Sequence, residues 1–167
     1  FSYPEGEYDI AYVAKHANPD DQAGNDTIWR SVVISKSMYA RDNGTISGGL
    51  GIGAGNGGFL GQEFRVVQTD ILDTVSVYYV SGYTGRPLGL AIWSMVNDTP
   101  STIIATTDTL SYIDDSARLY RLPIHGGGVV LNPGNYTFTA IEFDSTIQLG
   151  QAIGVFTTQT VWVNWPT

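Results

Sequence analysis

Hydrophobic and polar positions alternate along two neighbouring stretches in the middle of the chain. The first runs over residues 74–80 and the second over residues 88–93. A period of two is the pattern of β-strands that bury one face. The residues that share the apolar face are Val75, Val77 and Tyr79 in the first stretch, and Leu88, Leu90 and Ile92 in the second. Asp70 to Met95 is therefore predicted to hold two strands joined by a turn-rich link.

Short alternating segments recur along the rest of the chain, separated by turns rich in Gly, Pro, Asn and Asp. No window of eleven or more residues keeps the apolar spacing of a helix. The segments expected to form strands are 28–37, 62–68, 73–80, 88–95, 102–105, 118–122, 128–131, 135–143, 152–156 and 160–165. Short strands at this spacing indicate antiparallel sheets with little or no helix.

Two packed antiparallel sheets account best for this pattern. The predicted fold is an all-β, jelly-roll-like β-sandwich, and a closed barrel is the alternative. Residues 1–27 are expected to form an N-terminal arm or first strand, and residues 28–167 the sandwich domain. Asn43-Gly44 is a preferred hairpin pair, so we expect a hairpin that joins Ser31–Tyr39 to Thr45–Leu50.

Charge narrows the classes of partner. The 167 residues carry a formal net charge of −8 with eight Lys and Arg, so binding to nucleic acid or to an anionic membrane surface is disfavoured. No apolar run approaches the ~20 residues of a spanning helix, which argues against membrane insertion. There is no cysteine. An acidic chain rich in Asn, Thr and Gly, with little Lys, suggests an extracellular or cell-surface location.

The glycine-rich segment 48–61 satisfies G-x-G-x-x-G at Gly53, Gly55 and Gly58. A dinucleotide fingerprint also needs a helix that opens at the glycines, because the pyrophosphate rests on the helix N-terminus. Residues 62–67 have the pattern of a strand instead. We therefore interpret the glycines as a strand end or loop where the backbone passes close to a neighbour.

Few acidic or nucleophilic residues have a catalytic spacing. Glu142 and Asp144 project to one side of a strand, as paired carboxylates of a glycosidase would, but Ile147 stands where a third acid would be needed. Neither His16 nor His125 lies near a nucleophile signature. We predict that the chain is not an enzyme, and keep a glycan-active hydrolase using Glu142, Asp144 or Glu63 as an alternative.

A structural calcium ion is a second possibility for the acidic side chains. Sandwich domains hold calcium between loops with carboxylate, amide and carbonyl oxygens. The candidate ligands are Asp70 with Asp73, Asn97 with Asp98, Asp114 with Asp115, and Asp144. None of them forms a recognised calcium-loop motif, so the sequence does not define a ligand set.

Carbohydrate binding needs aromatic rings on an exposed sheet face, with polar side chains beside them for the hydroxyl groups. The alternation that turns the apolar residues inward turns Tyr78, Trp93 and Trp162 outward, and these three rings are the candidate binding residues. The competing interpretation is that they cover the second face of the sheets beneath loops or a neighbouring domain.

Several segments resemble a known family of modules. They are G-x-G-x-G-N-G-G-F-L-G-Q-E-F from Gly51 to Phe64, D-I-L-D-T-V-S-V-Y-Y from Asp70, L-G-L-A-I-W from Leu88, P-S-T-I-I-A from Pro100, and V-V-L-N-P-G-N-Y-T-F from Val129. Residues 49–156 are similar to jelly-roll accessory or adhesion modules of large secreted surface proteins of Bacteroidota, which the type IX system exports. The resemblance implies the fold and an extracellular compartment, and it carries over no site residue.

The prediction for function is a non-catalytic extracellular module of a larger secreted or surface protein, acting in adhesion or carbohydrate binding. Its expected partners are a glycan or a cell-surface protein, together with neighbouring domains of the same chain. A purely structural spacer or protein-interaction module is the main alternative.

Overall fold

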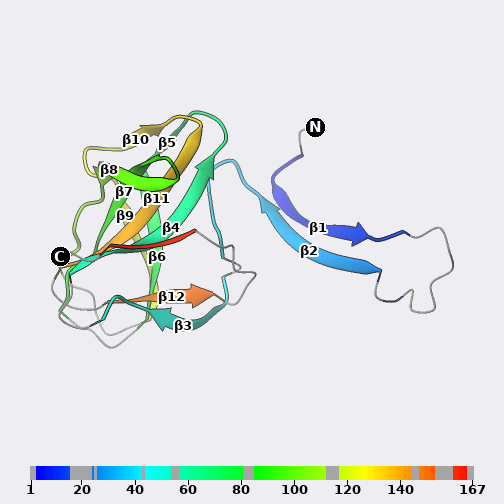
Figure 1. Cartoon of the computed structure of the whole chain (residues 1–167), viewed down its shortest axis with the longest axis horizontal. Helices are drawn as coiled ribbons and strands as arrows, with labels where there is room; N and C mark the ends of the chain where they lie inside the picture. Colours follow the sequence, from blue (N-terminus) through cyan, green and yellow to red (C-terminus); the bar gives the residue numbers. More distant parts are fainter. Residues whose placement is uncertain are drawn as a thin grey trace. The chain divides into compact units, whose positions relative to one another are not determined.

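The computed structural model describes residues 3–15, 24, 26–42, 44–53, 57–80, 85–111, 117–143, 147–152 and 160–164. The chain divides into two compact units, Phe1–Arg41 and Asp42–Thr167 (Figure 1). The first is a hairpin and the second contains the hydrophobic core.

The second unit is built from two main sheets, in which every pair of neighbouring strands is antiparallel. The five-stranded sheet has the order β13 (Val161–Asn164), β4 (Gly58–Val66), β11 (Gly134–Glu142), β7 (Gly89–Val96), β8 (Thr99–Thr106). The four-stranded sheet has the order β3 (Ile46–Leu50), β12 (Gln148–Ala152), β6 (Thr74–Val80), β9 (Arg118–Pro123). A small ribbon pairs β5 (Asp70–Leu72) with β10 (Val129–Leu131). The predicted all-β, antiparallel, sandwich-like class is confirmed, and the described residues contain no helix longer than a single 3₁₀ position.

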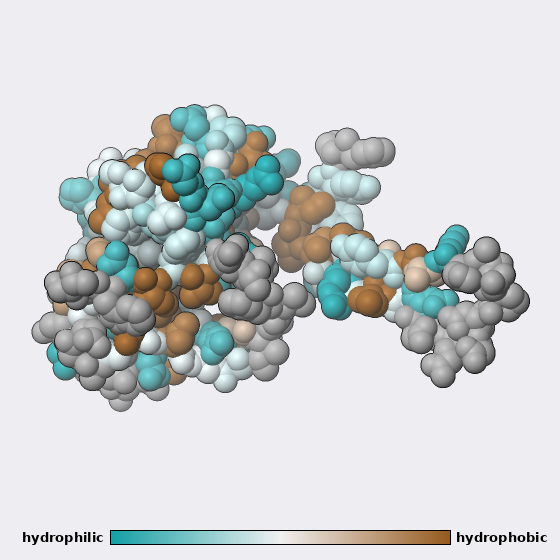
Figure 2. All heavy atoms as spheres, viewed as in Figure 1, coloured by the Kyte–Doolittle hydropathy of each residue, from teal (hydrophilic) through white to brown (hydrophobic). Residues whose placement is uncertain are grey.

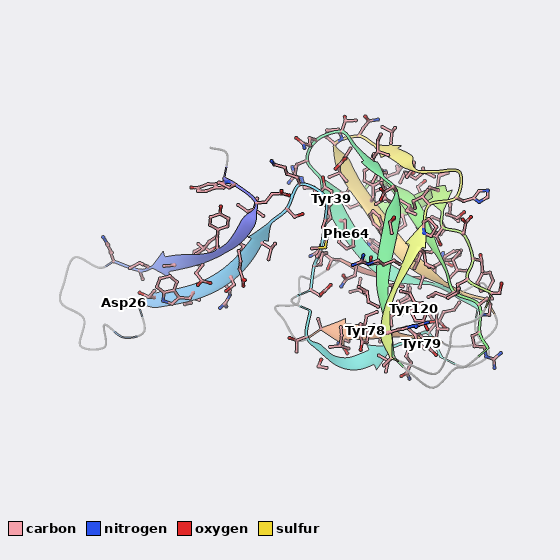
Figure 3. The ribbon with its side chains drawn as sticks, turned by 180° about the vertical axis from the view of Figure 1, so that it is seen from behind. Asp26, Tyr39, Phe64, Tyr78, Tyr79 and Tyr120 are labelled. Carbon is pink, nitrogen blue, oxygen red and sulfur yellow. The ribbon has the colours of Figure 1, made fainter. Side chains whose placement is uncertain are left out.

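The core lies between the inner faces of the two main sheets. Leu90 of β7 and Ala140 of β11 pack in one cluster with Tyr79 of β6 and Tyr120 of β9. The rings of Tyr79 and Tyr120 pack edge to face, with 6.1 Å between their centroids, and Figure 3 shows the two residues on adjacent strands. A second cluster surrounds Ile92. Fully burying a side chain such as Leu or Ile stabilises the fold by about 1.5–3 kcal/mol, so these faces supply the main driving force for sheet packing.

Asp70–Met95 forms strands as predicted. Its two alternating stretches are β6 and β7, which belong to different sheets, so the segment carries the chain from one layer of the sandwich to the other. The glycine-rich segment 48–61 runs into β4, which begins at Gly58, so a strand forms there rather than a helix, as expected. Of its three motif glycines, Gly55 lies outside the described residues.

The first unit consists of β1 (Gly6–Val13) and β2 (Thr27–Ile34), paired along their whole length. This pairing corrects the expected hairpin of Ser31–Tyr39 with Thr45–Leu50, because β2 pairs with β1 and β3 pairs with β12. The described residues between 35 and 45 form no strand, and the side chain of Asp42 accepts a hydrogen bond from the Gly44 backbone instead. Strand 28–37, expected in the sandwich, thus lies in the hairpin unit.

Candidate functional site

The structure brings two of the three predicted aromatic residues onto one surface. In the five-stranded sheet, Leu90 and Ile92 of β7 face the core, so Trp93 points to the opposite, outer face. Trp162 of β13 is paired with Gly61 of β4, which also faces outward. Tyr78 lies on β6 in the other sheet. The three predicted residues therefore do not form one surface, and the candidate site is the outer face of the five-stranded sheet.

Trp93 is held in a defined orientation on this face. Its Nε1 donates a hydrogen bond of 2.9 Å to the hydroxyl of Thr139, and that hydroxyl lies 3.3 Å from the Ala91 carbonyl oxygen, to which it donates. The ring of Phe59 meets the indole edge to face, with 4.9 Å between centroids. The half-buried indole is thus fixed from its polar edge and from one side by neighbours that the fold supplies.

Between Trp162 and Thr139 the outer face carries no side chain, because the residue of β4 at this position is Gly61. A Cβ on Gly61 would lie 1.9 Å from the Phe138 carbonyl oxygen, which is backbone and cannot swing away. Only glycine lets β4 and β11 approach this closely. Across β4 from Thr139, Trp162 is half-buried, and its Nε1 is buried without an acceptor among the described residues.

Toward the other end of the face, polar residues replace the aromatic ones. Thr137 is fully buried although it points outward, because Met95 covers it and accepts its hydroxyl hydrogen bond at 2.9 Å between oxygen and sulfur. Glu63 is paired with Thr137, and one step further along the strands Arg65 is paired with Asn135.

An open hollow of about 750 Å³ continues the face beyond Met95. Arg65 and Asn135 line it, together with Asn97 and Asp98 from the turn between β7 and β8. Both turn residues have positive φ, 50° and 56°, which Asn and Asp tolerate better than most residues. The volume lies within the range of small-molecule sites, about 300–1,000 Å³.

Sequence reasoning missed most of this surface. Phe59 and Thr139 hold the indole, Met95 accepts the hydrogen bond of Thr137, and Arg65 and Asn135 line the hollow. The alternation along 58–66 and 134–142 contained a signal for their outward direction. Which of them would be neighbours depended on the order β4–β11–β7, which no local pattern specifies.

Tyr78 has a structural contact on the outer face of the four-stranded sheet. Its ring lies over Gly150 of β12, so closely that a Cβ on Gly150 would come within 2.8 Å of it. An aromatic side chain that covers a glycine on the neighbouring strand restores packing that the glycine lacks. Figure 3 shows Tyr78 beside Tyr79, the core residue next to it on β6.

The two described acidic residues considered for hydrolysis lie on opposite faces of the sheet. Glu142 of β11 lies at an inner-face position and is 2% exposed, whereas Glu63 points to the outer face. These two carboxylates therefore cannot flank one glycosidic bond. Asp144 lies outside the described residues.

Glu142 is instead buried at the end of the core. One carboxylate oxygen accepts a 3.0 Å hydrogen bond from the Ile52 backbone N–H, and the other oxygen is buried without a partner. Burial raises the pKa of this carboxyl, and backbone hydrogen bonds from Ile52 and Ile147 oppose part of the rise. Through these hydrogen bonds the Glu142 side chain connects the end of β11 to the backbone at Ile52 and at Ile147.

His125 makes a hydrogen-bonded pair with Asp108 at 2.6 Å, and the two side chains are 77% and 59% exposed. Such an exposed pair contributes about 0–1 kcal/mol to stability. His16 lies outside the described residues.

The described calcium candidates lie in β5, in the residue after it and in the β7–β8 turn. Asp70 accepts a hydrogen bond from the Ile71 backbone, and Asp98 lies in the turn at the hollow. Among the described residues no three His, Cys, Asp or Glu side chains gather as metal ligands. Asp114, Asp115 and Asp144 lie outside the described residues.

Comparison of the chain with family models, with curated proteins and with solved structures gives no match. Within the described parts of the chain, no helix is long and apolar enough to span a membrane.

Proposed function

We propose that the chain is a non-catalytic module of a larger secreted or surface protein, and that it binds carbohydrate through the outer face of its five-stranded sheet. The observation that carries the proposal is the orientation of Trp93. Its indole is fixed by Thr139 and Phe59, and two positions further along β7 Met95 lines the open hollow. The extracellular setting is supported by the acidic composition and by the resemblance of residues 49–156 to secreted surface modules.

The chemistry of the face matches that of a sugar. A pyranose offers one apolar C–H face and a rim of hydroxyl groups, and a fixed indole supplies a partner for the first at little cost in conformational entropy. The hydroxyl groups find donors in Arg65, Asn97 and Asn135, and acceptors in the carboxylate of Asp98. Polar atoms gathered at one end of an apolar surface would orient the ligand along the strands.

The test is a glycan-array screen of the whole chain, followed by affinity measurements on Trp93→Ala and Trp93→Phe. We expect Trp93→Ala to weaken binding at least about tenfold, since ring contact and apolar burial are both lost. Trp93→Phe, which keeps a ring but loses the hydrogen bond to Thr139, should bind with intermediate affinity.

Tyr78→Leu is the matched control, because it alters an outward aromatic residue of the other sheet while keeping a cover for Gly150. It should bind as the unaltered chain does. Binding that Tyr78→Leu abolishes and Trp93→Ala leaves intact would move the site to the four-stranded sheet and refute the proposal.

The second candidate function is a structural or protein-interaction module. The β1–β2 hairpin favours it, because Trp29 and Val33 are 62% and 66% exposed there. Hydrophobic residues stand among hydrophilic ones on the visible side of this unit (Figure 2). A folded chain that binds no glycan on the array would select this candidate.

A further inference from the structure

We infer that the ligand of the outer face is a neutral glycan rather than an acidic one. This inference rests on the proposed function and names the substrate class of the same site. It follows from the charges that the register of β4, β11 and β7 places along the face.

Two acidic residues accompany Arg65 on the described part of this face. Arg65 lines the hollow, Asp98 lines the same hollow from the β7–β8 turn, and Glu63 precedes Arg65 by one outward position on β4. A uronate carboxylate bound at Arg65 would therefore share the hollow with the Asp98 carboxylate and lie one outward position along β4 from that of Glu63. Sites built for carboxylates use unopposed, often bidentate Arg groups.

Two side-chain amides of the hollow suit hydroxyl groups. The side-chain amides of Asn97 and Asn135 each offer both a donor and an acceptor, and a hydroxyl group can use either. Arg65 can donate and Asp98 can accept on neighbouring hydroxyls of one ring. Such a mixed set satisfies vicinal hydroxyl pairs without requiring any charge on the ligand.

The electrostatic field of the whole chain also disfavours an acidic ligand. With a net charge of −8, the chain repels a polyanion during approach, and this repulsion extends over about 30 Å at about 0.01 M salt. A neutral oligosaccharide is not subject to this repulsion. Its affinity should therefore be insensitive to salt.

The experiment measures affinity of the whole chain for two sets of probes by titration calorimetry. The first set contains oligosaccharides of neutral hexoses and pentoses, and the second contains oligouronides of galacturonate, mannuronate and guluronate. Each set is measured at about 0.01 M and about 0.15 M salt, where the screening length falls from about 30 Å to about 8 Å. Arg65→Gln and Asp98→Asn are measured alongside, the latter because Asn also tolerates the positive φ of this turn position.

We expect a neutral probe to bind with an affinity that changes by less than about twofold between the two salt concentrations. The uronides should bind at least about tenfold more weakly at low salt, and Asp98→Asn should narrow that gap. Arg65→Gln should cost the neutral ligand less than about tenfold, since it removes hydrogen bonds to uncharged groups.

A uronide that binds more tightly than every neutral probe, and that loses its affinity with salt and with Arg65→Gln, would overturn this inference while leaving carbohydrate binding intact. A chain that binds neither set, and no glycan on the array, overturns the proposed function and this inference together. The two failures are thus distinguishable in one series of titrations.

Discussion

The indole of Trp93 depends on a residue far away in sequence. Its outward direction follows from the alternation of β7, but its orientation depends on the hydroxyl of Thr139, 46 residues further along the chain. Thr139 is 3% exposed on an outward face, so the indole and its neighbours cover the hydrogen bond that orients them. A partly buried hydrogen bond of this kind is stronger in effect than an exposed one, because water competes for it less.

The carboxyl group of Glu142 is buried, and burial disfavours its charged form. Desolvation raises the pKa of its carboxyl above the ordinary 4.5. The folded state therefore holds a proton that the unfolded chain has already released, and the contribution of Glu142 to stability is largest below pH 4.5. That contribution is lost as the pH rises through the folded-state pKa.

We expect Glu142→Gln to remove this pH dependence. Gln keeps an oxygen that can accept the Ile52 hydrogen bond but does not ionise. The free energy of unfolding of the native chain should fall relative to that of the Gln variant as the pH rises above about 4.5. Urea denaturation of both proteins across pH 4 to 7, about the range that matters for a carboxyl, measures the difference. A difference that stays constant over this range would show that burial does not shift this group.

At the scale of elements, β7 combines two functions in one strand. Leu90 and Ile92 pack into the two core clusters on one side. On the other side Trp93 forms part of the candidate surface, and the buried Ala91 accepts the Thr139 hydrogen bond with its carbonyl oxygen. The strand lies inside the sheet between β11 and β8. A platform residue on such a strand is held more rigidly than one on a loop.

Truncation in β7 should therefore cost far more than truncation in its neighbour. Ile92 is 0% exposed, and Ile92→Ala should lower the free energy of unfolding by about 2–5 kcal/mol. Ile104 on β8, the edge strand of the same sheet, is 39% exposed, and Ile104→Ala should cost less than about 1 kcal/mol. Chemical denaturation compares the two variants, and equal losses would contradict the assignment of β7 to the core.

The strands themselves were predictable because alternation is local. β6, β7 and β11 begin and end within one residue of the segments expected from the sequence. Strand partners were predicted less well, and the expected hairpin at Asn43-Gly44 is wrong. A turn motif joins neighbouring strands only if the flanking residues are strands, and here residues 35–45 do not form one in their described part.

At the scale of the whole molecule, the two units differ in how they are stabilised. All members of both core clusters lie between Val66 and Leu149, within the second unit. No described residue of the first unit is fully buried. A two-stranded hairpin that buries little gains little free energy from its own contacts.

Removal of the first unit should leave the second one folded. We expect residues 42–167 to unfold in urea with a free energy within about 1 kcal/mol of that of the main transition of the full chain. The denaturant slope should also change little, because it follows the area exposed on unfolding. Loss of the cooperative transition in the shortened chain would show that the sandwich needs the hairpin.

The candidate site was only partly accessible from the sequence. Trp93 and Trp162 were identified as outward residues, and both lie on the outer face. Tyr78 was grouped with them, but it lies on the other sheet and covers Gly150. Alternation says which side of its own strand a residue occupies, and it says nothing about which sheet that strand joins.

The sequence by itself determined the class of fold, the positions of β6, β7 and β11, and the side of its own strand on which each of their alternating residues lies, since these depend on residues that are close together in the chain. The tertiary structure decided that β6 and β7 lie in opposite layers, that Gly61 separates Trp162 from Thr139, and that Arg65 meets the Asn97-Asp98 turn at one hollow. These neighbours are tens of residues apart, and only the pairing of whole strands, driven by burial of their inner faces, brings them together.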